Sequence, residues 1–498
     1  MLFNSAEFLI FFPIVVLVYF IIPKKIKYLW LLAASYYFYM CWNARYALLL
    51  FFSTAVTWAS GLLLERIKHG EIDEARKIPA KKAVVALSFF LNLGVLFWFK
   101  YVNFAVATLE RLLRLVHIQL SLPEFDILLP VGISFFTFQA LSYTMDVYRD
   151  EIYAEKNFFR YALFVSFFPQ LVAGPIERSK NLLKQLADPQ KFSFARFKDG
   201  ILLMLWGFFL KIVLADRLAL FVDTVYGDVW SYGGWYLIIA TMLFGVQIYC
   251  DFYGYSVIAT GAAEILGIRL MENFDAPYLS CSVAEFWRKW HISLTSWFRD
   301  YLYIPLGGSR RGKARKYRNK MIVFLISGLW HGAQSTYVVW GMLNGLYQVA
   351  GELTEPIRTR LIDACGLHRE SFAHRLLRCG ITFVLVDFSW IFFRASTVRR
   401  ALAIVRSILT AGNPWILLDG SLYECGLDSK NFWLVLLCIA VLLLADCLKH
   451  RGICVRKVIL RQDVWCQCMV VVFAIALILL FGLWGPAYSE ANFIYFQF

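Results

Sequence analysis

The chain has 498 residues, of which 60% are hydrophobic, 18% aromatic and 17% charged, and its formal net charge is +15. That much apolar surface cannot be buried in one water-soluble core, so the composition excludes an ordinary soluble protein and indicates a polytopic membrane protein. The basic residues are dispersed among loops between apolar runs, which is typical of membrane topology rather than of nucleic-acid binding.

Apolar runs long enough to cross the hydrocarbon as helices recur along the chain. We expect an all-α fold in a single membrane domain over residues 1–498, with no separate soluble domain and about ten to twelve crossings. The shorter or more polar runs are expected to be re-entrant or interfacial helices. The runs lie at 7–22, 28–42, 46–64, 83–99, 127–148, 158–174, 200–222, 235–258, 321–350, 376–393, 431–448 and 467–485.

The distribution of basic residues predicts the orientation of the first helices. The first run is followed, not preceded, by Lys24, Lys25 and Lys27, so it reads as a retained helix rather than a cleavable signal. The positive-inside rule places these lysines in the cytoplasm, together with the basic loops 65–82 and 177–198. The basic stretches at 394–406 and 449–461 lie one apparent crossing apart, so either one late segment is wrongly assigned as a crossing or one does not span.

The eleven cysteines include no CxxC pair and no Cys/His cluster. We therefore expect neither a disulfide framework nor a metal site.

A histidine interrupts the longest uncharged run. From Met321 to Gly351 there is no Asp, Glu, Lys or Arg, and His331 lies near the middle. In one continuous helix it would share a face with Ser327, Gln334 and Ser335, next to Trp330. Two interpretations stay open: a neutral histidine packed between helices, or a functional group in a cavity.

The segment 285–308 is both aromatic and charged, with Trp287 and Trp290 beside His291 and, further on, Arg299 and Asp300. This mixture predicts a helix that lies at the interface or dips into the protein and stops at Pro305. The alternative is an amphipathic surface helix.

A carboxylate, Asp251, lies inside an apparent crossing. There it must be neutral, paired or facing water. Pairing with Arg288, Arg299 or a histidine is the structural alternative to a functional role.

The loop 307–320 carries seven basic residues and no acid. It is typical of a cytoplasmic anchor, and it would also attract a polyanionic cofactor to the inner mouth of a cavity. The candidate cofactor-binding residues are Arg310, Arg311, Lys313 and Arg315.

Two histidines with a carboxylate and a basic inner mouth suit acyl transfer. A buried histidine tends to be neutral, and neutral imidazole accepts a proton from a hydroxyl that attacks a thioester. The chain has no GxSxG elbow, P-loop or HExxH motif. Two other classes remain: a proton-coupled transporter or flippase that uses His331, His291 and Asp251 as a relay, and a scaffold without chemistry.

Several blocks resemble the membrane-bound O-acyltransferase family in its bacterial polysaccharide-acetylating branch, which includes the alginate O-acetylation membrane subunit. The blocks are FWRKWHISLTSWFRDYLYIPLGG (286–308), SGLWHGA (327–333), LPVGISFFTFQALSYTMDVYR (129–149), FVSFFPQLVAGPIERSKNLLKQL (164–186), QIYCDFYGYS (247–256) and FIYFQF (493–498).

The resemblance implies tilted helices around a central tunnel, with His331 as the catalytic base and His291 as a second motif residue. It implies acetyl-CoA as co-substrate with no permanently bound cofactor, and a polysaccharide acceptor reached through an extracytoplasmic partner protein. D-alanyl transfer is the alternative within the family. The implied location is the bacterial cytoplasmic membrane.

Overall fold

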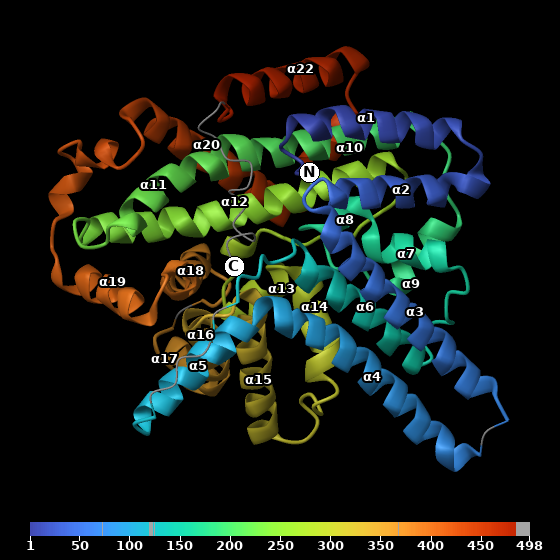
Figure 1. Cartoon of the computed structure of the whole chain (residues 1–498). Helices are drawn as coiled ribbons and strands as arrows, with labels where there is room; N and C mark the ends of the chain where they lie inside the picture. The colour runs from blue at the N-terminus through green and yellow to red at the C-terminus, as the bar shows by residue number, and fades with distance from the viewer. Residues whose placement is uncertain (72, 119–122, 124, 367, 485–498) are drawn as a thin grey trace. The chain divides into compact units, whose positions relative to one another are not determined.

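The computed structural model describes residues 1–71, 73–118, 123, 125–366 and 368–484, and all their regular structure is helical, as expected (Figure 1). The block 493–498 lies outside the described residues. The chain divides into two compact units. Unit 1 comprises Met1–Met204 and Ser256–Met271, and unit 2 comprises Leu205–Tyr255 and Glu272–Phe498.

Unit 1 is built mainly from the first nine helices. These are α1 Ala6–Ile21, α2 Lys27–Met40, α3 Ala47–His69, α4 Glu74–Lys100, α5 Val102–Leu115, α6 Ile133–Tyr148, α7 Phe158–Ser166, α8 Phe168–Leu171 and α9 Ser179–Ala187. Helices α3, α4 and α6 pack against one another, and α7 packs on α2 and α3.

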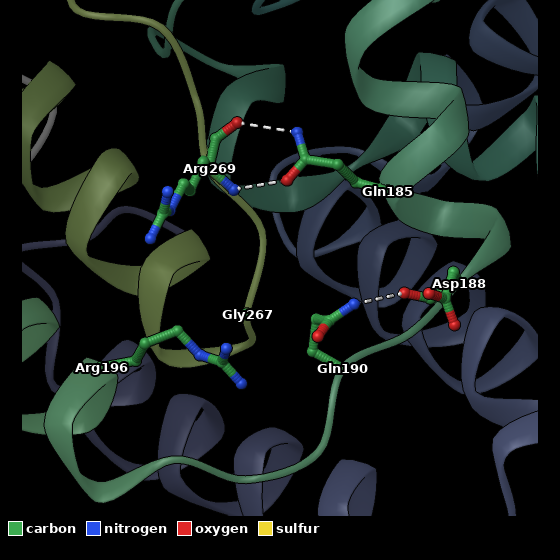
Figure 2. Close-up of a pocket in the computed structure, with 6 residues that line it drawn as sticks. All are labelled: Gln185, Asp188, Gln190, Arg196, Gly267 and Arg269. Carbon is green, nitrogen blue, oxygen red and sulfur yellow. Dashed lines mark hydrogen bonds between the residues drawn. The ribbon is translucent and has the colours of Figure 1, made fainter.

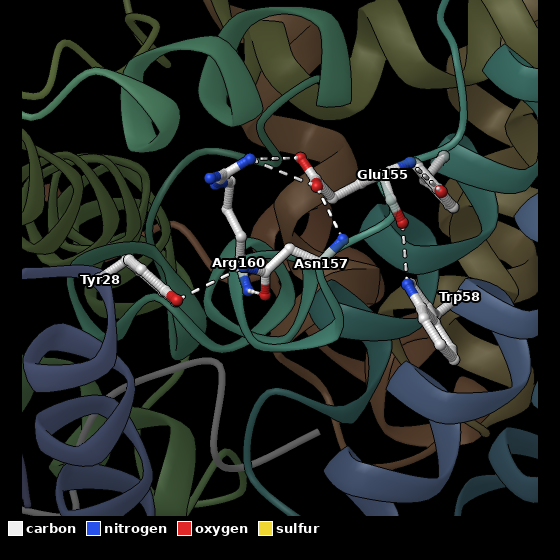
Figure 3. A network of polar contacts seen from close by, with 6 residues as sticks. Tyr28, Trp58, Glu155, Asn157 and Arg160 are labelled. Atoms are coloured by element: carbon white, nitrogen blue, oxygen red, sulfur yellow. Dashed lines mark hydrogen bonds and ion pairs between the residues drawn. The ribbon is translucent and has the colours of Figure 1, made fainter. Parts of the chain in front are cut away.

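A polar network ties the start of α7 to α2 and α3 (Figure 3). The side chain of Asn157 caps α7 by accepting from the Arg160 backbone N–H at 3.1 Å, and its Nδ2 donates to the Tyr28 hydroxyl at 3.4 Å. The Trp58 indole N–H donates to the Glu155 backbone carbonyl at 2.8 Å. Satisfying these polar groups internally lets the loop before α7 be partly buried.

Unit 2 contains the segments that carry both histidines. Its helices are α11 Asp216–Gly227, α13 Val283–Lys289, α14 Ile292–Phe298, α15 Lys313–His331, α16 Ser335–Leu353, α17 Glu355–Ala364, α18 Phe372–Arg394, α19 Val398–Thr410, α20 Ser429–His450, α21 Val455–Leu460 and α22 Val464–Phe481. Helices α10 Phe194–Phe208 and α12 Trp235–Ile265 contribute residues to both units. Two stretches, Phe209–Ala215 and Arg299–Tyr303, are π-helical.

Six helical segments in the described residues are long and apolar enough to span a membrane. They are Ala44–His69, Glu74–Lys100, Trp235–Ile265, Phe372–Arg394, Ser429–His450 and Val464–Phe481, and α1 is a shorter apolar helix. Both units contain such segments, and together they support a multi-pass membrane protein. The number is smaller than the ten to twelve crossings expected because several apolar runs are divided into shorter helices.

The clearest division falls in the run 321–350, which is not one crossing. Helix α15 ends at His331 and α16 begins at Ser335, so the run forms a helical hairpin. A Cβ on Gly328 would lie 2.3 Å from the Tyr337 carbonyl oxygen, and one on Gly341 would lie 2.3 Å from the Phe324 carbonyl oxygen. The two helices therefore approach so closely that only glycine fits at these positions, the kind of close contact that small residues allow between membrane helices.

An ion pair closes the other end of the hairpin. The Lys316 ammonium lies 2.6 Å from the Glu352 carboxylate, and Lys320 contacts the same carboxylate. The start of α15 is thereby held to the end of α16.

We predict that Gly328→Ala destabilises the hairpin. The added methyl group meets backbone, which cannot rotate away, so the free energy of unfolding should fall by about 1–3 kcal/mol. Thermal unfolding of the detergent-solubilised protein, followed by tryptophan fluorescence, measures the change.

The matched control is Gly351→Ala in α16, where a Cβ would meet nothing within 4 Å. This variant should be as stable as wild type or slightly more stable, since alanine favours helix. Equal melting temperatures for the two variants would contradict the close packing.

Candidate active site

His331 is the last residue of α15 and is only 4% exposed. Three aromatic rings surround its imidazole, with centroid distances of 4.9 Å to Trp330, 5.1 Å to Trp340 and 5.4 Å to Phe393. These rings, which we call the aromatic cage, come from α15, α16 and α18. The cage removes water from the imidazole, a setting in which the neutral form is favoured at rest.

The position of His331 at the end of its helix stabilises the imidazolium once the ring has accepted a proton. The carbonyl groups at the end of an α-helix form the negative end of the helix dipole, which attracts a cation in the last turn. A ring that is neutral at rest and stabilised when protonated suits a general base.

His291 occupies a strained turn between α13 and α14. Its backbone is left-handed, with φ 45° and ψ 55°, which is uncommon for a residue other than glycine. Asn273 holds the turn: its carbonyl accepts from the Ile292 N–H at 2.9 Å and its side-chain oxygen accepts from the Ser293 N–H at 3.3 Å. The single interfacial helix expected over 285–308 is thus broken at His291.

Burial lowers the pKa of His291 to about 3. The ring is 1% exposed and its Nδ1 lies 3.5 Å from the Ser293 hydroxyl. It is therefore neutral at physiological pH.

One indole ring lies against both histidines. The Trp330 ring centroid is 4.9 Å from that of His331 and 6.0 Å from that of His291. The His291 ring also packs edge-on against Phe252 of α12, at 4.6 Å. The two histidines, forty positions apart in the sequence, thus belong to one buried cluster.

The two tryptophans singled out in the 285–308 segment pack behind the aromatic cage. The Trp287 indole N–H donates to the Asn344 side-chain oxygen at 3.1 Å, and its ring lies 5.5 Å from that of Trp340. The Trp290 ring lies 5.3 Å from that of Trp390. Trp287 thus contacts the cage directly, whereas Trp290 reaches it through Trp390, which packs on Trp340 and Phe393.

Two of the residues expected on the face of His331 are not on it. Because α15 ends at His331, Gln334 lies in the turn and is exposed, and Ser335 begins the next helix. The prediction failed because an uncharged run does not show where a helix ends. Arg299 and Asp300 pair with each other at 2.8 Å in the π-helical stretch after α14.

Asp251 pairs with a residue that the sequence analysis missed. The Lys211 ammonium lies 2.6 Å from Asp251 and 2.8 Å from Asp216, and all three side chains are nearly fully buried. Lys211 was not among the partners considered from the sequence, which were Arg288, Arg299 and the histidines. Lys211 and Asp216 are five residues apart, a spacing that faces the same way in a π-helix but not in an α-helix.

The candidate cofactor-binding residues all lie at the surface. Arg310 and Arg311 are in the turns before α15, Lys313 and Arg315 are in its first turn, and all four are exposed. These exposed basic side chains are accessible to an anion in solution.

Two further resemblance blocks, 129–149 and 164–186, pack on each other in unit 1. The Gln139 side chain donates to the Phe164 carbonyl at 2.6 Å, and the Ser179 hydroxyl donates to Asp146. The blocks thus build the interior of this unit.

Figure 2 shows a polar cavity that the sequence analysis did not flag. It belongs to unit 1 and is lined by Gln185, Asp188, Gln190, Arg196, Gly267 and Arg269. The Gln185 side chain holds the Arg269 backbone through both its N–H and its carbonyl, at 2.8 and 3.0 Å. The central tunnel implied by the resemblance stays a prediction.

Comparison with known proteins identifies the family. Residues 37–361, which include both histidines, match the model of the membrane-bound O-acyltransferase family. The chain belongs to this family. As a member, it is an O-acyltransferase and a multi-pass membrane protein, which sets aside the transporter and scaffold alternatives.

Its relatives include bacterial acyltransferases. The chain is 35% identical to the probable alginate O-acetylase AlgI of Pseudomonas syringae over 80% of this chain and 74% of the relative. It is 31% identical to the peptidoglycan O-acetyltransferase of Helicobacter pylori over 82% and 80% of the two chains. With the teichoic acid D-alanyltransferase of Bacillus subtilis it shares 28% identity over 47% and 61%.

We predict that Lys211→Met lowers the free energy of unfolding by about 3–5 kcal/mol, because it leaves two buried carboxylates without their cation. Urea or thermal unfolding of the purified protein measures the change. Lys180→Met is the control, since Lys180 and Glu151 form an exposed pair worth about 0–1 kcal/mol. Similar losses for both variants would show that the buried triad is not a stabilising contact.

A second prediction concerns pH. The pKa of His291 is lower in the fold than in the unfolded chain, so the unfolded state binds the proton more readily and stability falls as the pH drops below about 6.5. Between pH 7.5 and 5 the expected contribution of His291 is about 2 kcal/mol, at 1.36 kcal/mol per unit.

His291→Asn isolates this contribution, because asparagine tolerates the left-handed backbone and does not titrate. Between pH 7.5 and 5, the melting temperature should fall more for wild type than for the variant. Parallel pH dependences would contradict the burial of a neutral imidazole.

Proposed function

We propose that this protein transfers an acetyl group from acetyl-CoA to a hydroxyl of an extracytoplasmic polysaccharide, or of a partner protein that relays the group to the polymer. The observation that carries the proposal is the buried pair of histidines around Trp330, with His331 inside the aromatic cage at the end of α15. The protein would act in the bacterial cytoplasmic membrane, as its bacterial relatives suggest.

In this reaction His331 is the general base. It takes the proton of the attacking hydroxyl while the oxygen forms a bond to the acyl carbon, and the C–S bond breaks as the thiolate leaves. His291, neutral and held in its strained turn, keeps Trp330 and hence the His331 ring in place. Asp251, in the Lys211 triad, has a structural part.

Acetyl is favoured over D-alanyl because of the extent of the similarity. The two O-acetylating relatives align with 80% or more of this chain, whereas the D-alanyltransferase aligns with 47%. The exposed basic residues 310–315 support a phosphate-bearing donor such as CoA.

The test is acetyl transfer by purified protein with radiolabelled acetyl-CoA and acetylatable polysaccharides, with and without the candidate partner protein. We expect His331→Ala to lose about 10² to 10⁴-fold in kcat, the usual contribution of a positioned base. His450→Ala, at an exposed histidine of the same unit, should keep wild-type activity. If His331→Ala transfers acetyl as fast as wild type, the assignment of the base is wrong.

A further inference from the structure

Two tryptophans near His331 differ from other tryptophans of the chain in the hydrogen bonding of their buried indole N–H groups. Trp340 is fully buried and Trp390 is 1% exposed, yet neither Nε1 makes a well-formed hydrogen bond in the part of the chain that the structure describes. The polar group beside the Trp390 indole is the Tyr278 hydroxyl, which donates its own proton to the Gly245 carbonyl at 2.6 Å. By contrast, the indole N–H groups of Trp30, Trp58 and Trp287 each donate to an oxygen. A buried donor without a partner costs about 1–3 kcal/mol, so it calls for an explanation.

A buried acceptor beside Trp390, the Asp387 carboxylate, also has an oxygen without a hydrogen-bond partner in the described parts of the chain. Asp387 is 8% exposed, and its Oδ1 has no hydrogen-bond partner among the described residues. A Cβ placed on Gly245 would be 2.9 Å from this oxygen, 3.4 Å from the Tyr278 hydroxyl and 3.6 Å from Cδ1 of Trp390, the carbon bonded to Nε1. The carboxylate and the indole thus border the same small space.

These groups form a row that starts at His331. The Trp340 ring is 5.1 Å from His331, and the Trp390 ring stacks on that of Trp340 at 5.8 Å. Phe393, Trp390 and Asp387 are three residues apart and so follow one face of α18 over about 9 Å. We call Trp340, Trp390 and Asp387 the polar row.

The polar row runs along the α15–α16 hairpin, away from the turn at His331. Phe393 packs on Tyr337 at 5.0 Å, and Ser389 accepts from Asn344 at 3.3 Å. Moving from Phe393 towards Asp387 therefore follows α16 from its start towards Glu352, the residue paired with Lys316. The row runs from His331 towards the basic end of the hairpin, which the charge distribution places in the cytoplasm.

We infer that the polar row recognises the proposed thioester donor, with Trp340 at the thioester carbonyl and with Trp390 and Asp387 at the secondary amide of the thiol arm. The inference rests on the proposed function. From the reacting carbon outwards, such a thioester presents a carbonyl oxygen and then an amide with one oxygen and one N–H. The polar row presents the complementary sequence: the Trp340 donor, the Trp390 donor and the Asp387 acceptor.

In this arrangement Trp340 donates to the thioester carbonyl oxygen opposite His331. As the hydroxyl adds, negative charge develops on that oxygen, and a fixed donor in a water-free site stabilises it. The charge then returns to form the carbonyl of the ester while the thiolate leaves. Trp390 and Asp387 hold the amide of the arm, which keeps the acyl carbon in place before and during attack.

Two small thioesters of matched length separate these roles. One is S-acetyl-N-acetylcysteamine, which carries the amide, and the other is S-pentyl thioacetate, in which two methylene groups replace the amide N–H and C=O. Steady-state kinetics on both donors are measured for wild type, Trp340→Phe, Trp390→Phe, Asp387→Leu and Asp387→Asn, and each variant is checked for monodispersity and melting temperature.

We expect wild type to prefer the amide-bearing donor. Trp340→Phe should lose about 10² to 10³-fold in kcat on both donors, the usual effect of removing one oxyanion donor. Trp390→Phe and Asp387→Leu should raise KM for the amide-bearing donor about tenfold and leave the pentyl donor unaffected. Asp387→Asn, which keeps an acceptor oxygen, should retain the preference.

Trp58→Phe in unit 1 is the matched control, because its N–H donates to Glu155. It should keep wild-type kinetics on both donors.

The contrary results are distinct. If Trp340→Phe keeps kcat while His331→Ala loses it, the indole only packs in the cage, and the proposed function stands without this inference. If Trp390→Phe and Asp387→Leu affect both donors equally, the amide is not recognised. If His331→Ala turns over both donors like wild type, the proposed function fails and the inference fails with it.

Discussion

The close contact between α15 and α16 is the interaction on which the candidate active site depends. Gly328 and Gly341 let the two backbones meet, so the chain can turn back directly after His331. The turn ends α15 at the imidazole and brings Trp340 of the returning helix against it. A larger residue at either glycine would separate the helices and open the aromatic cage.

The buried lysine and the two buried histidines are stabilised in different ways. In a low-dielectric setting a charge persists only with a partner, and Lys211 lies between two carboxylates. The histidines are instead surrounded by aromatic rings, which favour neutral imidazole. The triad thus holds a charge that is paired on both sides, whereas the two histidines of the candidate site are held as neutral imidazoles.

Much of this arrangement was predictable from local patterns. The apolar runs identify the helical membrane fold, and the blocks around His291 and His331 identify the family. That the two histidines form one cluster does not follow from their spacing, because Trp330 joins them only after α15 packs beside the turn at His291.

Other features depend on backbone geometry that composition does not reveal. The helix end at His331 lies in a run without charges, where hydropathy continues unchanged through Gly332 and Ala333. The buried group of Lys211, Asp216 and Asp251 was missed because Lys211 and Asp216 face the same way only in a π-helical turn, which the sequence does not reveal. A lysine in the apolar run 200–222 was the one signal available, since an intramembrane cation requires a nearby anion.

The most direct test of the account is a structure of the protein with acetonyl-CoA, a ketone analogue of acetyl-CoA that cannot release its acyl group. We expect the ketone carbonyl to lie inside the aromatic cage, with its carbon facing the His331 ring and its oxygen at the Trp340 indole N–H. A carbonyl bound away from the cage, with no contact to His331, would contradict it.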